Sequence, residues 1–504
     1  MPNVASFPGI LRALRWIGMS PEKEFSNNPG AVATKQPLCV DLDGTLVRSD
    51  TLHEGLLSAA KGWRSFSRVL AALPKGKAHF KAVVAEMGPT DPSLLPYNRK
   101  LLQYLRDEKQ VGTHLVLATA ANSRIALAVA EHLGLFDDVI ASDATTNLRG
   151  DRKAHALSER FGKHGFRYAG NDRADLPVWR VASNAVLVNT SARVSKSAAT
   201  ITTIEAEIQD KRATLRSIVR ALRPYQWSKN LLVFVPILTA HAEADPRSWL
   251  FALLNFVAFC CVASASYLVN DLLDLPADRI HVRKRNRPLA SGALPIAIAF
   301  LLIPLLYAIG AVFAFLSHVP LLLALYVAVT MAYSWQLKKM PLIDFFTLSA
   351  LYVLRLFAGG KSSGHPVSLW LLAFSSFFFL SLALVKRVAE LKAYEGSGTL
   401  SKRAYAHEDT QTLEVMGIAS SFASIVVLAL YVQSDVTVQL LHYARPELLW
   451  PIVPLMLFWQ CRIWLSTARK YMLDDPIVYA AKDWVSWLVG ITMLASMALA
   501  RLHK

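Results

Sequence analysis

Cysteine is scarce in this sequence. Its 504 residues include only four cysteines, and their spacing matches none of the patterns by which cysteines bind metals. Three of the four lie in apolar segments, where cysteine behaves as a small hydrophobic residue. We therefore expect neither a cysteine metal site nor a disulfide framework, and we assign the cysteines to a reduced compartment: Cys39, Cys260, Cys261 and Cys461.

Acidic residues are in the minority. The chain has 37 Asp and Glu against 54 Lys and Arg, which gives a net charge of +17. Nucleic-acid binding can produce such an excess, but the N-terminal half has no patch in which arginines alternate with aromatic residues, so we expect no nucleic acid. The basic residues instead gather in loops between long apolar segments, as on the cytoplasmic side of a bacterial inner or plasma membrane protein.

Long apolar runs are absent from the first two hundred residues and frequent thereafter. Residues 1–36 form a basic N-terminal segment without the apolar core or cleavage site of a signal peptide. Residues 37–200 have the short apolar runs of a soluble α/β domain, and residues 201–229 form an amphipathic linker. Residues 230–504 then predict an all-α polytopic membrane domain of about nine helices, the first of them short, at 231–243. The basic loops place the soluble domain in the cytoplasm.

Three carboxylates follow one of the long apolar runs. Asp271, Asp274 and Asp278 lie three and four residues apart, which on a helix places them on one face, where like charges repel. A divalent cation removes that repulsion, and ligands that are all oxygen favour Mg²⁺ completed by substrate phosphates. Basic residues just beyond can bind the same phosphates, among them Lys284 and Arg287. The pattern predicts Mg²⁺-diphosphate chemistry at a membrane surface.

Two features qualify this interpretation. A capped helix end flanked by positive charge on the cytoplasmic side is the alternative, but it does not explain three acids on one face. Pro276, inside the motif, is expected to kink or end the helix and to move Asp278 relative to the other two.

A second acidic pair follows a short apolar run near the start of the soluble half. Asp41 and Asp43 come after residues 38–40, and Gly44 permits a sharp turn behind them. Both carboxylates then face one pocket, as a nucleophile and its acid/base partner do. Further polar residues follow later apolar runs or turns: Thr119, Lys153, Asn171, Asp172 and Asp175. Strands alternating with helices predict a parallel sheet that carries this site at its strand ends.

This ordered set resembles the haloacid dehalogenase (HAD) phosphohydrolases, with a Rossmann-like sheet and a small helical cap at residues 52–110. The resemblance implies that Asp41 attacks phosphorus, that Asp43 is the general acid/base, and that Thr119 and Lys153 anchor the phosphate. It also implies Mg²⁺ held by these two aspartates with Asp172 or Asp175.

One position departs from the HAD pattern. Many members have Asp directly after the glycine, at the position where this chain has Asn171. The sequence therefore leaves two candidates for the metal ligand, Asn171 and Asp172. A HAD-like fold kept only for docking or regulation is the alternative, against which the intact pair of Asp41 and Asp43 argues.

Residues 215–501 resemble the UbiA superfamily of intramembrane prenyltransferases. Its first acidic motif stands complete here, from Asn270 to Asp278. Most members carry a second aspartate-rich motif after the sixth span, whereas this chain has Lys386, Arg387 and Glu390 there, followed by Tyr405. Cations can bind phosphate without a second metal. The cations at this position and the segment 223–230 before the first span together resemble the decaprenyl-phosphate phosphoribosyltransferase branch of the superfamily. Enzymes of that branch use 5-phosphoribosyl diphosphate and a polyprenyl phosphate.

The resemblance suggests which side chains of the membrane half bind substrate, although for each single cation positive-inside topology is the alternative. Arg355 lies inside an apolar stretch, so it should face a cavity or a partner, and Asp344 of the same stretch is the alternative partner. The substrate-binding candidates are Lys229, Asn230, Asn270, Lys284, Arg287, Arg355, Lys386, Arg387, Glu390 and Tyr405.

Two functions follow from these resemblances. In the first, the membrane half makes polyprenylphosphoryl 5-phosphoribose and the HAD half removes the 5-phosphate. In the second, the membrane half moves a prenyl group from a prenyl diphosphate to an aromatic or lipid acceptor, and the HAD half is regulatory or acts on another phosphate ester. The missing second aspartate motif favours the first.

Overall fold

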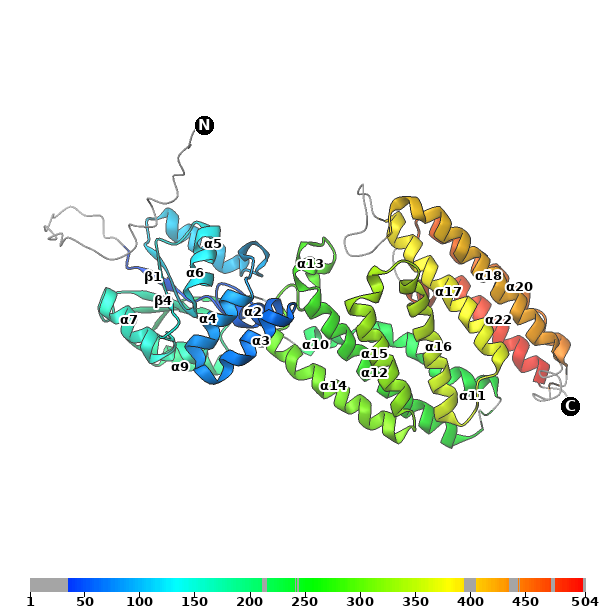
Figure 1. Cartoon of the computed structure of the whole chain (residues 1–504). Helices are drawn as coiled ribbons and strands as arrows, with labels where there is room; N and C mark the ends of the chain where they lie inside the picture. The colour runs from blue at the N-terminus through cyan, green and yellow to red at the C-terminus, as the bar shows by residue number, and fades with distance from the viewer. Residues whose placement is uncertain are drawn as a thin grey trace, which may run out of the picture.

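The chain forms an α/β domain followed by a helical domain (Figure 1). The structure is a computed structural model that describes residues 35–210, 215–240, 242, 244–393, 405–434, 443, 445–472 and 476–501. The expected N-terminal segment, apart from residues 35 and 36, therefore lies outside the described residues.

A six-stranded parallel sheet is the centre of the N-terminal domain, as the sequence predicts. Its strand order is β3-β2-β1-β4-β5-β6. Val40, the last residue of β1, pairs with Leu117 of β2 and Ala169 of β4, so the residues that follow these three strands meet at one edge. The strands are β1 Leu38–Val40, β2 Leu115–Asn122, β3 Asp138–Ser142, β4 Arg167–Gly170, β5 Asn184–Val188 and β6 Thr203–Ile208.

Helices cover both faces of this sheet. Leu38 and Val40 pack on one side with α5 (Arg99–Gln110) and α6 (Ser123–Leu133), whereas Cys39 packs on the other with the remaining helices. This alternation is the two-residue period of a strand that is buried on both faces. The elements on the second side are α7 Asp151–Phe161, η4 Arg173–Asp175, α8 Leu176–Val181 and α9 Ala192–Ala199.

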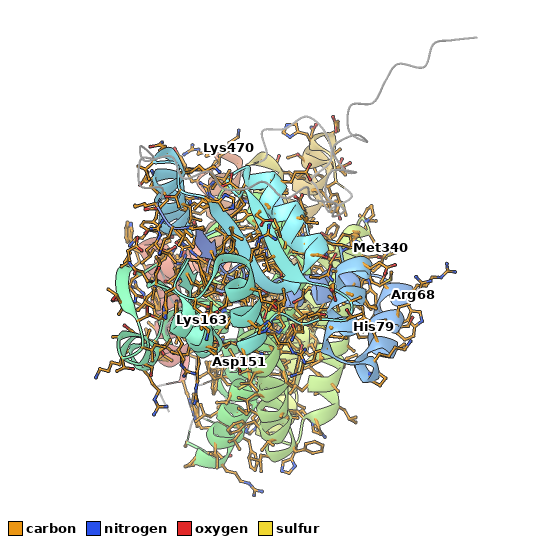
Figure 2. The ribbon with its side chains drawn as sticks, turned by 90° about the vertical axis from the view of Figure 1, so that its left-hand side faces the viewer. Arg68, His79, Asp151, Lys163, Met340 and Lys470 are labelled. Carbon is orange, nitrogen blue, oxygen red and sulfur yellow. The ribbon has the colours of Figure 1, made fainter. Side chains whose placement is uncertain are left out.

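A small helical cap follows the first strand, with its own core of Ala59, Val69 and Val84. Its upper boundary was expected at residue 110, but α5 packs on the sheet, so the cap ends before it. Figure 2 looks onto this domain and shows the cap, marked by Arg68 and His79, on the opposite side from Lys163. The cap consists of α2 Thr51–Ala59, α3 Trp63–Ala72, η2 Leu73–Lys75 and α4 Lys77–Met87, and the short η3 Pro92–Leu94 that follows contacts α6.

The linker begins later than predicted. Residues 203–208 pair with β5 as the edge strand β6, so the domain extends past residue 200. The alternation of Ile204, Ala206 and Ile208 with polar residues is a strand pattern, and its assignment to the amphipathic linker is wrong. Helix α10 (Leu215–Leu222) does form, with Ala221 buried against the helical domain.

The helical domain has fewer long helices than the nine expected. Within the described residues, seven helical segments are long and apolar enough to cross a membrane. Helix α15 has only 16 residues, which rise about 24 Å. The first expected span, 231–243, is instead a 3₁₀ segment followed by a five-residue helix that has a proline in its first turn.

These elements run from η5 to α22. In chain order they are η5 Pro224–Phe234, α11 Val235–Thr239, α12 Pro246–Leu273, α13 Leu275–Ile280, η6 Lys284–Asn286, α14 Ile296–Leu316, α15 Pro320–Trp335, η7 Leu337–Lys339, α16 Ile343–Ser363, α17 Leu369–Lys392, η8 His407–Asp409, α18 Thr410–Gln433, η9 Pro446–Leu449, α20 Ile452–Ala468, α21 Pro476–Lys482 and α22 Trp484–Arg501. In Figure 1 the N-terminal domain lies at the end of the bundle where α14 begins, with the cap nearest to it.

Candidate active sites

The N-terminal site is built around a buried lysine at the start of α7. Lys153 Nζ donates to Asp41 Oδ1 at 2.7 Å and to the Tyr168 hydroxyl at 2.8 Å. That hydroxyl donates in turn to Asp175 Oδ1 at 3.0 Å. The predicted Asp41, Lys153 and Asp175 therefore meet at the carboxyl edge of the sheet, and Tyr168 of β4, which the sequence analysis did not select, connects them.

Burial governs the charges at this site. It raises the pKa of Asp41 to about 6, even though Lys153 opposes the shift, and it raises the pKa of Asp43 to about 7, with the nearby Asp50 adding to the effect. Burial alone would lower the pKa of Lys153, but Asp41 and Asp175 outweigh it, so the pKa of the lysine is raised. The lysine stays charged beside a carboxylate that can act as a nucleophile, while Asp43 can hold a proton near neutral pH.

Thr119 and Lys153 line a cavity of about 640 Å³ together with Asp41 and Asp43. Thr119 is buried just before the end of β2, and its Oγ1 accepts from the backbone N–H of Ala121 at 3.0 Å. Asp43 Oδ1 accepts from the N–H of Thr51, at the start of α2, at 2.8 Å. The structure thus brings together the four residues expected to act on phosphorus.

The loop after β4 separates the roles of Asn171 and Asp172. Gly44 has φ +76°, and a Cβ there would collide with the side-chain amide of Asn171, so this amide lies against the turn that follows Asp43. Asp172 Oδ1 instead accepts from the N–H of Arg173 at 2.6 Å and caps η4. Asp175 Oδ2 fixes the loop by accepting from the N–H groups of Asn171 and Asp172 at 2.9 and 3.1 Å.

The oxygens around this cavity suit Mg²⁺. Within the described residues, no three side chains of His, Cys, Asp or Glu form a metal cluster by themselves. Asp41, Asp43 and Asn171 line this cavity, and their carboxylate and amide oxygens would supply an oxygen-only donor set. Hard cations prefer such ligands.

The acidic motif of the helical domain is divided by a helix break. Helix α12 ends at Leu273, and α13 begins two residues later with Pro276 in its first turn. Arg287 Nη1 lies 3.0 Å from Asp271 Oδ1 and 2.5 Å from Asp278 Oδ2, so these two carboxylates share one cation. The expectation that all three acids lie on one continuous helical face is therefore wrong.

The third acid of the motif and a neighbouring arginine complete this region. Asp274 Oδ2 lies 3.3 Å from Nζ of Lys338, on η7 just after α15, whereas Arg223 forms an ion pair with Asp271. Two carboxylates that converge on one guanidinium nitrogen are also suited to hold a metal cation, and their donor atoms are those that Mg²⁺ prefers. Arg223 and Lys338 were not among the predicted site residues, although each lies in a basic segment next to an apolar run.

A buried ion-pair cluster occupies the place where a second acidic motif was sought. The side chain of Arg387 is fully buried on α17, lies 2.7 Å from Asp344 Oδ2 and also pairs with Glu390. The Tyr405 hydroxyl donates to Asp344 Oδ1 at 2.7 Å. The predicted Arg387, Glu390 and Tyr405 thus come together, around an aspartate that the sequence analysis considered only as a partner of Arg355.

Arg355 has other partners. Its Nε donates to Asn230 Oδ1 at 2.8 Å and its Nη2 to the Tyr326 hydroxyl at 2.7 Å. The guanidinium is buried, so the expectation that it faces a partner holds, but the alternative pairing with Asp344 is wrong. Lys229, next to Asn230, lies 5.9 Å from the centre of the Tyr352 ring, on the same helix as Arg355.

The other predicted binding residues lie outside these clusters. Lys284 is exposed on η6, Lys386 is half-buried beside Arg387 on α17, and Asn270 is half-buried in the last turn of α12. Their assignment to phosphate or ribose remains a prediction.

Comparisons with known proteins agree with this division. Residues 64–180 match the haloacid dehalogenase-like hydrolase family, and residues 231–480 match the UbiA prenyltransferase family. The chain is 37% identical to the uncharacterized protein y4nM of Sinorhizobium fredii over 92% of this chain and 91% of that protein. It is 32% identical to the decaprenyl-phosphate phosphoribosyltransferase of Mycolicibacterium smegmatis over 56% of this chain and 92% of that protein. A UbiA homolog from Archaeoglobus fulgidus, solved with GPP and Mg²⁺, is 18% identical with a TM-score of 0.44, over 56% of this chain and 99% of that one.

Proposed function

We propose that this integral membrane enzyme, which belongs to the UbiA prenyltransferase family and carries a HAD-like phosphatase domain, makes a lipid-linked phosphoribose and then removes its 5-phosphate. The substrates of the membrane half are a polyprenyl phosphate and 5-phosphoribosyl diphosphate. The product after both steps is a polyprenylphosphoryl ribose, released on the cytoplasmic side, where we place the N-terminal domain.

The cluster around Arg387 is the observation that carries this proposal. A Mg²⁺ ion there would have to displace the fully buried Arg387 from Asp344 and Glu390. At the first motif the side chain of Arg287, which pairs with Asp271 and Asp278, is 27% exposed and can give way to a metal. A donor bound through one metal and several cations suits a sugar that bears both a diphosphate and a 5-phosphate. The similarity to a decaprenyl-phosphate phosphoribosyltransferase supports the same choice.

In the transfer step, an oxygen of the polyprenyl phosphate forms a bond to the anomeric carbon of the ribose. The bond from that carbon to the diphosphate breaks, and the diphosphate leaves with the electron pair. Because the attacking phosphate is already deprotonated, no protein base is needed. Mg²⁺, held by Asp271 and Asp278, would neutralise charge on the leaving diphosphate. Arg287 and Arg223, which pair with those aspartates, are placed to contact the same phosphates.

In the phosphatase step, an oxygen of Asp41 forms a bond to phosphorus while the bond from phosphorus to the ribose 5-oxygen breaks. Asp43 donates its proton to that oxygen, for which a pKa of about 7 is well suited. A water then gives a proton to Asp43 and bonds to phosphorus, which frees Asp41 and releases inorganic phosphate. Lys153 and Thr119 hold the phosphate oxygens during both displacements.

Membranes that contain the chain can test the donor directly. We expect radiolabel from 5-phosphoribosyl diphosphate to enter the lipid fraction only when a polyprenyl phosphate is added. The alternative function predicts instead that a prenyl diphosphate and 4-hydroxybenzoate give a prenylated product. Activity with the second pair and none with the first would overturn the proposal.

A further inference from the structure

The phosphatase cavity has a wall that belongs to the other domain. Besides residues of the sheet edge and the cap, the cavity of about 640 Å³ is lined by Pro295, Ile296 and Ala297. These residues begin α14, a helix long and apolar enough to cross a membrane. The phosphatase site is therefore enclosed by three parts of the chain, one of them the transferase domain.

A buried ion pair holds the two domains together beside this wall. Arg279 Nη2 and Nη1 lie 2.6 and 3.1 Å from the two carboxylate oxygens of Glu54, and only 8% and 7% of these side chains is exposed. Glu54 is in the first turn of the cap helix α2, and Arg279 directly follows Asp278 of the acidic motif. The pair thus connects the cap to the transferase site.

A second set of contacts closes the same boundary. Arg48, between the catalytic turn and the cap, pairs with Asp210 and donates to the carbonyl of Ser291 at 3.3 Å. At Gly292, where φ is +70°, a Cβ would lie 2.7 Å from Cβ of Arg48. The backbone that leads into α14 therefore fits closely against the phosphatase domain.

The outer face of α14 is apolar up to this boundary. Leu301 and Leu305 are 69% and 49% exposed, and the Phe300 ring lies 5.9 Å from the ring of His53 on α2. In a membrane, this face contacts lipid chains, while the first turn of the helix lies at the level of the head groups. A lipid lying along α14 would bring its head group to Ala297, which is at the edge of the cavity.

The cap also brings positive charge to the cavity. Lys77 and Lys81 of α4 line it, and Lys81 Nζ donates to the Ala120 carbonyl at 2.7 Å and to Asn147 Oδ1 at 3.1 Å. These amines line the same cavity as the phosphate anchors Thr119 and Lys153. A substrate with an anionic group besides the phosphate to be removed would suit a cavity that carries both.

We infer that the first turn of α14 is a specificity-determining wall of the phosphatase site, and that this site selects a phosphate monoester carried on a membrane lipid. The lipid part rests on the proposed function, because the transferase would supply such a substrate. The wall itself does not depend on the identity of the substrate.

The wall can be tested with a soluble probe and the full-length chain in detergent. Ala297→Trp should raise the KM for p-nitrophenyl phosphate at least fivefold, because the indole would extend into the cavity. Leu301→Trp, one turn further on the exposed face, is the matched control and should leave this KM unchanged. Retained transferase activity shows that both variants are folded. An unchanged KM for Ala297→Trp would show that the first turn of α14 is not a wall of the phosphatase site.

The lipid selectivity requires a second comparison. Glu54→Gln should reduce kcat/KM for lipid-linked phosphoribose at least tenfold, with little effect on p-nitrophenyl phosphate, because α14 would no longer be held against the cap. The exchange of charges, Glu54→Arg with Arg279→Glu, should restore part of the loss. Equal effects on both substrates would overturn the lipid selectivity. If the wild-type chain cleaves p-nitrophenyl phosphate but not lipid-linked phosphoribose, the proposed function is wrong. The Ala297→Trp experiment would still test whether the first turn of α14 forms a wall of the phosphatase site.

Discussion

Lys153 and Asp41 form a buried ion pair of 2.7 Å across the carboxyl edge of the sheet, although they are 112 residues apart in the sequence. Each residue stabilises the charged form of the other. Asp41 raises the pKa of Lys153, and Lys153 opposes the rise that burial causes in the pKa of Asp41. In the proposed function the substrate phosphate enters next to this pair, so both residues are expected to act on it.

Asp41→Asn should separate the two reactions of the chain. The amide cannot attack phosphorus, so phosphatase activity should be lost while lipid-linked phosphoribose still forms. Mass spectrometry of extracted lipids should show a product that keeps its 5-phosphate, whereas the wild type gives the dephosphorylated lipid. Identical dephosphorylated lipid from both proteins would mean that the N-terminal domain acts on another compound.

Asn171 and Asp172 should respond differently to substitution. Asn171→Ala removes an amide that lies against the catalytic turn, so we expect a loss of phosphatase activity that added Mg²⁺ restores in part. Asp172→Ala removes only a helix cap, worth about 1 kcal/mol, and should leave most of the activity. The Mg²⁺ dependence of p-nitrophenyl phosphate hydrolysis distinguishes them, and the reverse order would assign the metal to Asp172.

The acidic motif of the membrane half can be tested in the same way. Asp271→Ala removes a carboxylate that shares Arg287 with Asp278, and transfer should fall by about 100-fold or more, as when a group that stabilises a leaving charge is lost. Asp274 faces Lys338 instead, so Asp274→Ala should have a smaller effect. Labelled lipid formed per folded protein measures both, and near-normal transfer by Asp271→Ala would contradict the metal assignment.

The sequence predicted the sheet well because its strands depend on local patterns. Apolar runs that end in Asp41, Thr119 and Gly170 identify parallel strands whose carboxyl ends meet. The strand 203–208 was missed because it lies at the edge of the sheet, where every second residue is exposed. A short amphipathic segment has a similar composition of apolar and polar residues.

Contacts between distant segments could not be predicted in this way. Arg387 pairs with Asp344 across two helices, and Glu54 pairs with Arg279 across two domains, and neither pair has a spacing that the sequence reveals. The helix break at Pro276 was expected. The sequence did not reveal that Asp278 would still lie close to Asp271. Arg287, in the loop that follows α13, pairs with both carboxylates.

Arg387 and Lys386 should differ because only Arg387 is fully buried. Arg387→Ala leaves Asp344 without its cation, a loss of about 3–5 kcal/mol for a buried pair, so the thermal stability of the purified protein should fall. Arg387→Met with Asp344→Asn should recover part of that stability. Lys386→Ala should instead raise the KM for phosphoribosyl diphosphate. Unchanged kinetics in well-folded Lys386→Ala would assign that lysine to membrane topology.

The pair of Arg167 and Glu108 should make the N-terminal domain sensitive to acid. Burial disfavours the carboxylate of Glu108, but hydrogen bonds from Arg167, Lys35 and Thr113 outweigh it and lower its pKa to about 2, from an ordinary value of 4.5. A group whose pKa is lowered in the folded state stabilises the fold above its unfolded value and loses that contribution as the pH falls toward its folded value. Amide hydrogen exchange in β4 should therefore accelerate relative to β2 as the pH falls below about 4.5, after correction for the intrinsic pH dependence of exchange. In Arg167→Gln the pKa of Glu108 should return toward its ordinary value, so the amides of β4 should exchange faster at neutral pH. Their exchange should then accelerate less as the pH falls. An unchanged acid response in this variant would show that another group controls the acid sensitivity.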